Sequence, residues 1–344
     1  MATYYGTYGQ KVQYLASDPS DPQIGQVWYN STSATLKVRG ALSTGAWASG
    51  GNLAVARTLM GSAGTQTATL AFGGYLGNPP GGYSSSVESY NGSSWTTLPA
   101  TMPSALAMLG SCGPQTATLI FGGQGNSSSY TFNGSSFSLV PGGTIPVPGN
   151  YSFGTAGVST AALSISGCIA PGSYTTSASK FNGTSWTSAG DIPAGRREVS
   201  NGTCGTQTAA IYAGGNPNDA NNGGTTQVDL YNGSTWTSGT ALPASISAAG
   251  IFGTQSNYIV AGGYSFPSTL NLSTALNYNG TSWTSTPSMP GIRGYSSGAG
   301  NGTNSSGLLF GGTVGQPIGE APFTNTTLLW SGPGAAITQT VTVS

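Results

Sequence analysis

The sequence predicts an all-β protein in which one four-stranded unit is repeated around a ring, after a small β-hairpin arm. The first observation is a repeated segment in which an aromatic residue, Asn-Gly and two Ser or Thr residues precede a second aromatic residue. Asn-Gly between two alternating runs predicts a β-hairpin, because both central residues of a type I′ turn need positive φ. The copies are residues 90–96, 132–138, 181–187, 231–237 and 278–284.

The second observation is the spacing of the glycines, which make up 56 of the 344 residues. Glycine pairs recur about every 48 residues, at Gly73-Gly74, Gly122-Gly123, Gly214-Gly215, Gly262-Gly263 and Gly311-Gly312, with Ser166-Gly167 as a degenerate member. A further glycine stands nine residues before the first member of each pair, at Gly64, Gly113, Gly157, Gly205, Gly253 and Gly302. Such a period, with four short strands per unit, is typical of a β-propeller blade and predicts six blades.

The third observation is an aromatic position with the same period, occupied by Trp47, Trp95, Phe137, Trp186, Trp236 and Trp283. In the last unit Trp330-Ser-Gly replaces Tyr-Asn-Gly. A Trp at a fixed place in each repeat is expected to pack between blades, where it buries roughly 150–250 Å². We therefore interpret these seven aromatic residues as structural.

Together these features resemble the kelch repeat, in which Gly-Gly ends one strand, Tyr ends the next, and Trp, Pro and often Arg follow. The resemblance covers roughly residues 46–332, and the propeller domain is expected over residues 46–334. The Arg is present in three units only, as Arg57, Arg196 and Arg293. The resemblance implies six four-stranded blades in a closed ring. The last unit lacks its own Trp strand, so the strand around Trp47 is expected to close the ring. Residues 335–344 form a C-terminal tail that could compete for that place.

Residues 1–45 form a separate arm. The segments 25–30 and 35–39 alternate polar and apolar residues around a Ser/Thr turn, which predicts a second kind of hairpin. The pattern PQIGQVWYNSTSATLKVRG resembles a short hairpin module of tail fibres and other virion structural proteins of tailed phages. This resemblance implies a role in attachment or oligomerisation.

Composition excludes several functions. Eight basic and eight acidic residues leave no net charge and no basic patch, so nucleic acid is not an expected partner. The chain has no histidine, the commonest general base and a common metal ligand, and we expect neither a cofactor nor a metal. No signal peptide or membrane-spanning run is visible. The three cysteines, Cys112, Cys168 and Cys204, show no C-x-x-C spacing, and Cys112 and Cys204 are expected to be free.

Candidate binding residues lie in the variable loops after the glycine pairs, because loops of this kind gather on one face of a propeller and carry function. They are Tyr75, Tyr83, Asn216, Asn218, Asp219, Tyr264 and Phe266. No catalytic residue is expected, since the carboxylates are scattered over different units and glycoside hydrolysis needs two in one cleft. These carboxylates are Asp18, Asp21, Glu88, Asp191, Glu198, Asp219, Asp229 and Glu320.

The sequence thus favours a non-enzymatic structural protein of a phage virion, such as a fibre, spike, knob or capsid decoration, that displays a propeller for host-surface glycan recognition. Its expected partners are other virion proteins through the arm, further copies of itself, and a host cell-surface glycan. Two alternatives remain: a glycan-active enzyme on a propeller, and a bacterial surface or filament protein that uses the propeller for protein contacts.

Overall fold

The computed structural model describes residues 12–41, 44–77, 82–146, 154–170, 173–197, 205–217, 224–265, 270–299, 303–315, 322–334 and 336–341. Within these ranges every regular element is a β-strand and none is a helix. The chain divides into two compact units. The small unit is Met1–Ala46 with Ser331–Ser344, and the large unit is Trp47–Trp330.

The described part of the large unit contains six four-stranded antiparallel sheets. In five of them the strands lie side by side in chain order, and in the sixth the last strand comes from the beginning of the unit. The first sheet consists of β5 (Gly61–Thr65), β6 (Ala68–Phe72), β7 (Val87–Tyr90) and β8 (Trp95–Thr97). The second consists of β9 (Gly110–Cys112), β10 (Thr118–Phe121), β11 (Ser129–Phe132) and β12 (Phe137–Leu139). The third consists of β13 (Gly154–Val158), β14 (Ala161–Ile165), β17 (Ser177–Phe181) and β18 (Trp186–Asp191).

The remaining sheets follow the same plan. The fourth consists of β19 (Gly205–Thr206), β20 (Ala209–Ala213), β21 (Val228–Tyr231) and β22 (Trp236–Ser238). The fifth consists of β23 (Gly250–Thr254), β24 (Asn257–Ala261), β27 (Ala275–Tyr278) and β28 (Trp283–Thr286). The sixth consists of β29 (Ser297–Ala299), β30 (Ser306–Phe310), β31 (Thr327–Ser331) and β4 (Ala46–Ser49). Two-stranded sheets, β15 (Cys168–Ala170) with β16 (Ser173–Tyr174) and β25 (Tyr264–Ser265) with β26 (Leu270–Asn271), lie in loops after glycine pairs.

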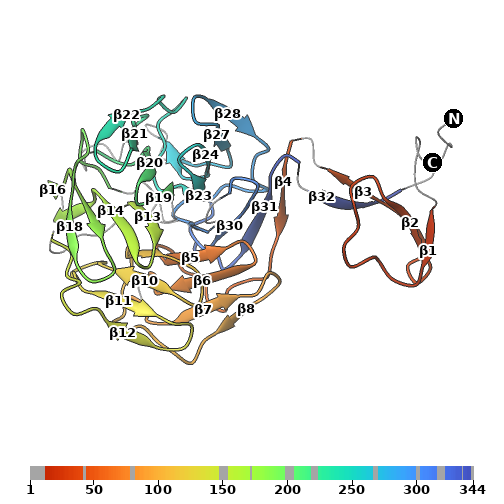
Figure 1. Ribbon diagram of the computed structural model, residues 1–344, viewed down its shortest axis with the longest axis horizontal. Coiled ribbons are helices and arrows are strands. Elements are labelled where there is room, and N and C mark those ends of the chain that lie inside the picture. The colour runs from red at the N-terminus through yellow and green to blue at the C-terminus, as the bar shows by residue number, and fades with distance from the viewer. Residues whose placement is uncertain are drawn as a thin grey trace. The chain divides into compact units, whose positions relative to one another are not determined.

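The six sheets are arranged around a centre, and strands β5, β13, β19 and β23 lie on the inside (Figure 1). Each inner strand contacts the inner strand of the next sheet, in the series β5, β9, β13, β19, β23 and β29, and β29 also contacts β5. The core consists of apolar side chains packed between adjacent sheets, such as Phe72 against Phe132 at 5.9 Å between ring centroids. This all-β arrangement of small four-stranded antiparallel sheets is compatible with a β-propeller.

The repeated glycines are explained by backbone conformation and close approach. Gly64 has a φ of +110°, and a Cβ there would collide with the carbonyl oxygen of Ala68 on the paired strand. Gly113, Gly157, Gly205 and Gly253 share this geometry, whereas Gly302 lies outside the described residues. A side chain at any of these positions would both strain φ and break the hairpin.

The degenerate pair Ser166-Gly167 keeps the conformation of the other pairs although its first residue is not glycine. Ser166 has a φ of +57°, close to the +58° of Gly73. The Ser166 Oγ lies 2.7 Å from the carbonyl oxygen of Thr175 and 2.9 Å from that of Arg196, and its one O–H group is shared between these two acceptors. These hydrogen bonds offset the roughly 1–3 kcal/mol cost of a left-handed serine.

The Asn-Gly turns differ from the predicted type I′ turn. Tyr90 pairs with Trp95, which leaves a four-residue loop of Asn91–Ser94. Only Gly92 has positive φ, at +95°, and the Asn91 Oδ1 accepts the backbone N–H groups of Ser93 at 3.0 Å and Ser94 at 2.9 Å. The asparagine therefore acts as a side-chain acceptor that shapes the loop, rather than as a left-handed residue.

A glutamine two residues after the repeated glycine links each of four sheets to the preceding one, and sequence analysis did not single it out. The Gln115 Nε2 donates to the carbonyl oxygens of Thr69 at 2.9 Å and Tyr90 at 2.8 Å. The Gln66 Nε2 donates in the same way to Gly307 at 3.0 Å and Trp330 at 2.6 Å, so the first sheet is joined to the sixth. Gln207 and Gln255 occupy the equivalent positions in the fourth and fifth sheets.

The periodic Trp residues pair with the aromatic residue that ends the preceding strand of the same sheet. The ring centroids of Tyr90 and Trp95 are 5.1 Å apart, and those of Trp47 and Trp330 are 5.0 Å apart although these two lie at opposite ends of the large unit's sequence. Several of the indoles also donate to a neighbouring sheet, as Trp95 Nε1 does to Thr327 Oγ1 at 2.8 Å. The equivalent aromatic pairs involve Phe132–Phe137, Phe181–Trp186, Tyr231–Trp236 and Tyr278–Trp283.

The described part of the small unit forms one sheet of β1 (Gln13–Leu15), β2 (Val27–Asn30), β3 (Thr35–Ala41) and β32 (Ala336–Thr340). Strands β2 and β3 form the hairpin predicted from the sequence. The C-terminal β32 pairs with β3 in this sheet, while β4 lies beside β31 in the large unit.

The Asp18 carboxylate connects three side chains of the small unit. It accepts Trp28 Nε1 at 3.0 Å and Asn30 Nδ2 at 2.7 Å, and pairs with Lys37 Nζ at 2.6 Å. The bond from Lys37, together with those from Asn30 and Trp28, lowers the pKa of Asp18 from 3.8 to about 2. Trp28 is fully buried beside this carboxylate.

Candidate ligand-binding loops

The loops after the glycine pairs of the first and sixth sheets bring three aromatic rings together. Tyr75 directly follows Gly73-Gly74, and its ring centroid lies 5.8 Å from Tyr83 and 5.8 Å from Phe323. We call these three residues the aromatic cluster. Tyr83 is 37% exposed, and its hydroxyl donates to the Gln124 Oε1 from the loop of the second sheet.

Backbone pairing holds the aromatic cluster in place. Tyr75 exchanges backbone hydrogen bonds with Thr58, at 3.1 and 2.8 Å, and also forms a β-bridge with Tyr83. Phe323 forms the equivalent bridge with Thr313. These rings therefore project from paired backbone segments and need little further ordering to meet a ligand.

Phe323 was not among the predicted binding residues, although the sequence contains a signal for it. Tyr83 stands seven residues before Tyr90, and Phe323 stands seven residues before Trp330. Both therefore occupy one position of the repeat. The prediction considered only aromatics close behind a glycine pair, and the longer loop of the sixth unit hid this equivalence.

Two of the predicted binding residues, Tyr264 and Asn216, are buried in the structure. Tyr264 is 2% exposed and its ring lies 5.7 Å from that of Tyr295, while Asn216 is 0% exposed. Both directly follow a glycine pair and pair through their backbones with Ser247 and Arg197. The predicted residues Asn218, Asp219 and Phe266 lie outside the described residues.

Two buried carboxylates of the large unit form ion pairs with arginines that recur at one position of the repeat. The Glu88 Oε1 lies 2.6 Å from Arg57 Nη2, and its Oε2 accepts the backbone N–H of Ala54 at 2.8 Å. The Asp229 Oδ2 lies 2.6 Å from Arg196 Nη1, and both side chains are 0% exposed. A carboxylate held in this way is an ion-pair partner and is not placed to transfer protons to a ligand.

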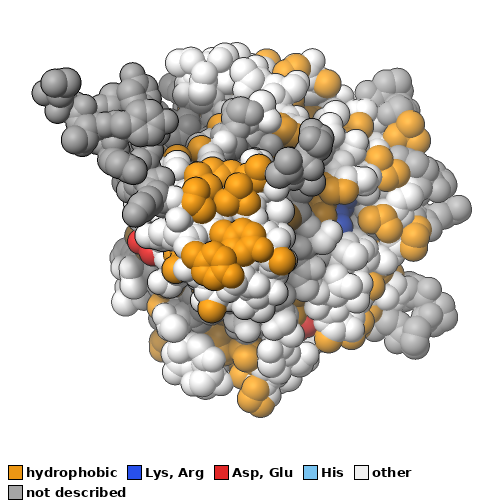
Figure 2. All heavy atoms as spheres, turned by 90° about the vertical axis from the view of Figure 1, so that its right-hand side faces the viewer, with side chains coloured by type: hydrophobic (Ala, Val, Ile, Leu, Met, Phe, Trp, Pro, Cys, Tyr) orange, Lys and Arg blue, Asp and Glu red, His pale blue; other side chains and the backbone are white. Residues whose placement is uncertain are grey.

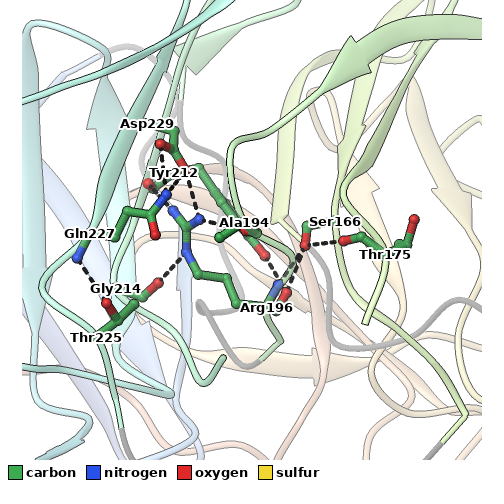
Figure 3. Close-up of polar contacts among 9 residues, drawn as sticks. All are labelled: Ser166, Thr175, Ala194, Arg196, Tyr212, Gly214, Thr225, Gln227 and Asp229. Atoms are coloured by element: carbon green, nitrogen blue, oxygen red, sulfur yellow. Dashed lines mark hydrogen bonds and ion pairs between the residues drawn. The ribbon is translucent and has the colours of Figure 1, made fainter. Parts of the chain in front are cut away.

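The guanidinium of Arg196 has several hydrogen-bond partners besides its ion-pair partner (Figure 3). Besides Asp229, its guanidinium donates to the carbonyl oxygens of Gly214 at 2.7 Å and Tyr212 at 2.9 Å, and it stacks over the Tyr212 ring at 4.4 Å. Gln227 adds a hydrogen bond of 3.1 Å to the Asp229 Oδ1.

The part of the chain that the structure describes contains no cluster of side chains suited to metal binding or thiol chemistry. No group of three or more His, Cys, Asp or Glu side chains gathers among the described residues. Cys112 and Cys168 are buried and neither forms a disulfide, and burial raises the pKa of the Cys112 thiol. Cys204 lies outside the described residues.

A scan against protein-family models gives no match, and a search of curated proteins gives none either. The class of the protein is therefore defined by its architecture: an all-β chain of small four-stranded sheets, compatible with a β-propeller, with aromatic side chains at its loops. No helix among the described residues is long and apolar enough to cross a membrane. The face shown in Figure 2 carries hydrophobic and uncharged polar side chains, with only isolated charged groups.

Proposed function

We propose that the chain is a non-enzymatic structural protein of a phage virion that displays a six-bladed, kelch-like propeller for recognition of a host-surface glycan. The observation that carries the recognition role is the aromatic cluster of Tyr75, Tyr83 and Phe323, with centroid distances of 5.8 Å. The virion role rests on the hairpin of the small unit, whose sequence resembles that of phage structural proteins.

The proposal of a closed, six-bladed ring is supported by contacts between the first and sixth sheets. Strand β29 contacts β5, and Gln66 of the first sheet donates to Trp330 of the sixth at 2.6 Å. In this proposal Trp47 supplies the outer strand of the sixth blade and takes the place of the missing Trp strand.

A sugar is the ligand class that suits the aromatic cluster. Sugars present C–H faces that pack on aromatic rings and hydroxyls that need hydrogen-bond partners. Tyr83 and Gln124 offer a phenol hydroxyl and an amide beside the rings. The aromatic cluster contains no Lys, Arg, Asp or Glu, which favours contact with the uncharged ring of a sugar.

Attachment is assigned to the small unit. Its sheet places Tyr14 beside Tyr29 with ring centroids 5.2 Å apart, and Tyr14 is 75% exposed. Val12 and Ile24 in the same unit are 54% and 62% exposed. Exposed apolar side chains of this kind on a small sheet mark an interaction surface.

The two assignments can be separated with matched Tyr variants of the full chain. Tyr83→Ala is expected to weaken binding to a glycan array by about tenfold or more, because it removes stacking and a hydroxyl. Tyr14→Ala should leave glycan binding unchanged but reduce the amount of the protein in purified particles, measured by mass spectrometry. Glycan binding that survives Tyr83→Ala would refute the recognition role, and full incorporation of Tyr14→Ala would refute the attachment role.

A further inference from the structure

Three buried arginines occupy one position of the repeat, ten residues after a Trp: Arg57, Arg196 and Arg293. Their exposed fractions are 1%, 0% and 4%. A buried guanidinium keeps its charge, and removal from water costs several kcal/mol unless a partner compensates. The partners of the three arginines therefore need to be compared.

Two of these arginines meet a carboxylate at a fixed repeat position, two residues before the aromatic residue that ends the third strand. Glu88 precedes Tyr90 in this way and binds Arg57, and Asp229 precedes Tyr231 and binds Arg196. In the sixth sheet the equivalent residue, two before Trp330, is Leu328.

Among the described residues, the side chain of Arg293 consequently has neutral hydrogen-bond partners only. Its Nη1 donates to the carbonyl oxygens of Gly311 at 3.1 Å and Thr326 at 2.9 Å, and its Nη2 donates to the Thr326 Oγ1 at 2.5 Å. These bonds use three of the five N–H groups of a guanidinium. No ion pair links Arg293 to a carboxylate among the described residues. Burial lowers its pKa from 12.5 to about 10, so it remains charged at neutral pH.

A cavity of about 270 Å³ lies against this arginine. Arg293 and Leu328 line it, together with the polar residues Ser49, Asn52 and Thr326. All belong to the sixth sheet or to the segments next to it. The volume lies just below the roughly 300–1,000 Å³ of pockets for drug-sized ligands, which suits a single small group.

We propose that this cavity binds a carboxylate, which pairs with Arg293 in the way that Glu88 and Asp229 pair with the other two arginines. Guanidinium and carboxylate match in geometry, and a hydrogen bond between charged groups is about twice as strong as a neutral one. The hydroxyl of Ser49 and the amide of Asn52 would face the rest of the ligand. The carboxylate could belong to a small free acid or to a uronic acid residue of a polysaccharide.

The inference stands apart from the aromatic cluster and from the virion role, since it rests on Arg293 and its cavity alone. The test is a titration of the full chain with sodium D-glucuronate, followed through the arginine Nε–H signals by ¹⁵N–¹H NMR. The chain has five arginines, so these signals are few. The Arg293 signal is expected to move, while those of Arg57 and Arg196 stay in place as internal controls.

Parallel titrations with sodium acetate and with D-glucose, at the same ionic strength, show which chemical group of the ligand is recognised. Equal binding of acetate and glucuronate assigns the site to a free carboxylate, and tighter binding of glucuronate assigns it to an acidic sugar. An Arg293 signal that moves as much with glucose or sodium chloride, or does not move with either acid, would overturn the inference.

Leu328 provides a matched pair of variants. Leu328→Asp supplies the missing carboxylate within the chain and should weaken glucuronate binding by about tenfold or more. Leu328→Asn has the same shape without the charge and should retain binding, so equal loss in both variants would contradict the proposal. Glu320→Gln, a change outside the described residues, should bind as the native chain does; binding confined to that variant would also contradict it. The native titration decides the question should the aspartate variant not fold.

Discussion

Asp229→Leu places a leucine opposite the buried arginine of the fourth sheet, as Leu328 is placed in the sixth. The contacts of Asp229 indicate how much this change lowers the free energy of unfolding. Asp229 and Arg196 are both 0% exposed, and their closest atoms are 2.6 Å apart. Loss of one partner from such a pair leaves a buried charge uncompensated, which costs about 3–5 kcal/mol. Arg196 already donates to the carbonyl oxygens of Gly214, Tyr212 and Ala194, so it cannot move to water without breaking these bonds too.

The assay is equilibrium unfolding in urea, followed by Trp fluorescence and circular dichroism, with Arg196→Met and the double variant completing a cycle. We expect the double variant to be less destabilised than the sum of the single variants by about 2 kcal/mol or more, because removal of both charges removes the uncompensated one. The reasoning is refuted by a cost below about 1 kcal/mol for Asp229→Leu or by additive single changes.

Two further predictions concern the sheet junction and the small unit. Gln66→Ala should lower the free energy of unfolding by about 2–4 kcal/mol, since it leaves the carbonyls of Gly307 and Trp330 without their amide donor, and urea unfolding of Gln66→Ala beside Gln115→Ala would show whether the two junctions are equivalent. A cost within experimental error would exclude this role. Because the pKa of Asp18 is lowered from 3.8 to about 2, its contribution to the small unit is present above pH 3.8 and is lost as the pH falls through about 2. The indole N–H signal of Trp28 should shift over this window and should not do so in Asp18→Asn.

The sheets could be predicted from the repeat because the sequence features that mark them are local. A glycine that must adopt positive φ, such as Gly64, and an aromatic pair such as Tyr90 and Trp95 depend on short stretches of chain. Those stretches recur, so each copy supports the others. The turn type was predicted wrongly because the Asn91 side chain, rather than its φ, shapes the loop.

The candidate site was less predictable because it depends on contacts between repeats. Tyr75 and Tyr264 occupy the same repeat position, yet Tyr264 is 2% exposed and Tyr75 meets Phe323 from another sheet. Whether such a residue faces solvent is decided by the neighbouring loop. Likewise, the carboxylate partner of each paired arginine lies 31 or 33 residues later in the chain. This pairing was recognised only from the contacts of Glu88 and Asp229 in the structure.

The order of strands in the sixth sheet has a consequence for synthesis of the chain. Strand β4 leaves the ribosome before every other strand of the large unit, yet its neighbour β31 is made last among them. During translation the Trp47 ring has no Trp330 to cover it, and β4 remains an unpaired strand. Messenger RNAs truncated before the codon of Leu328 should therefore yield proteins that aggregate. Messenger RNAs that extend past the codon of Trp330 encode β31, the strand that pairs with β4.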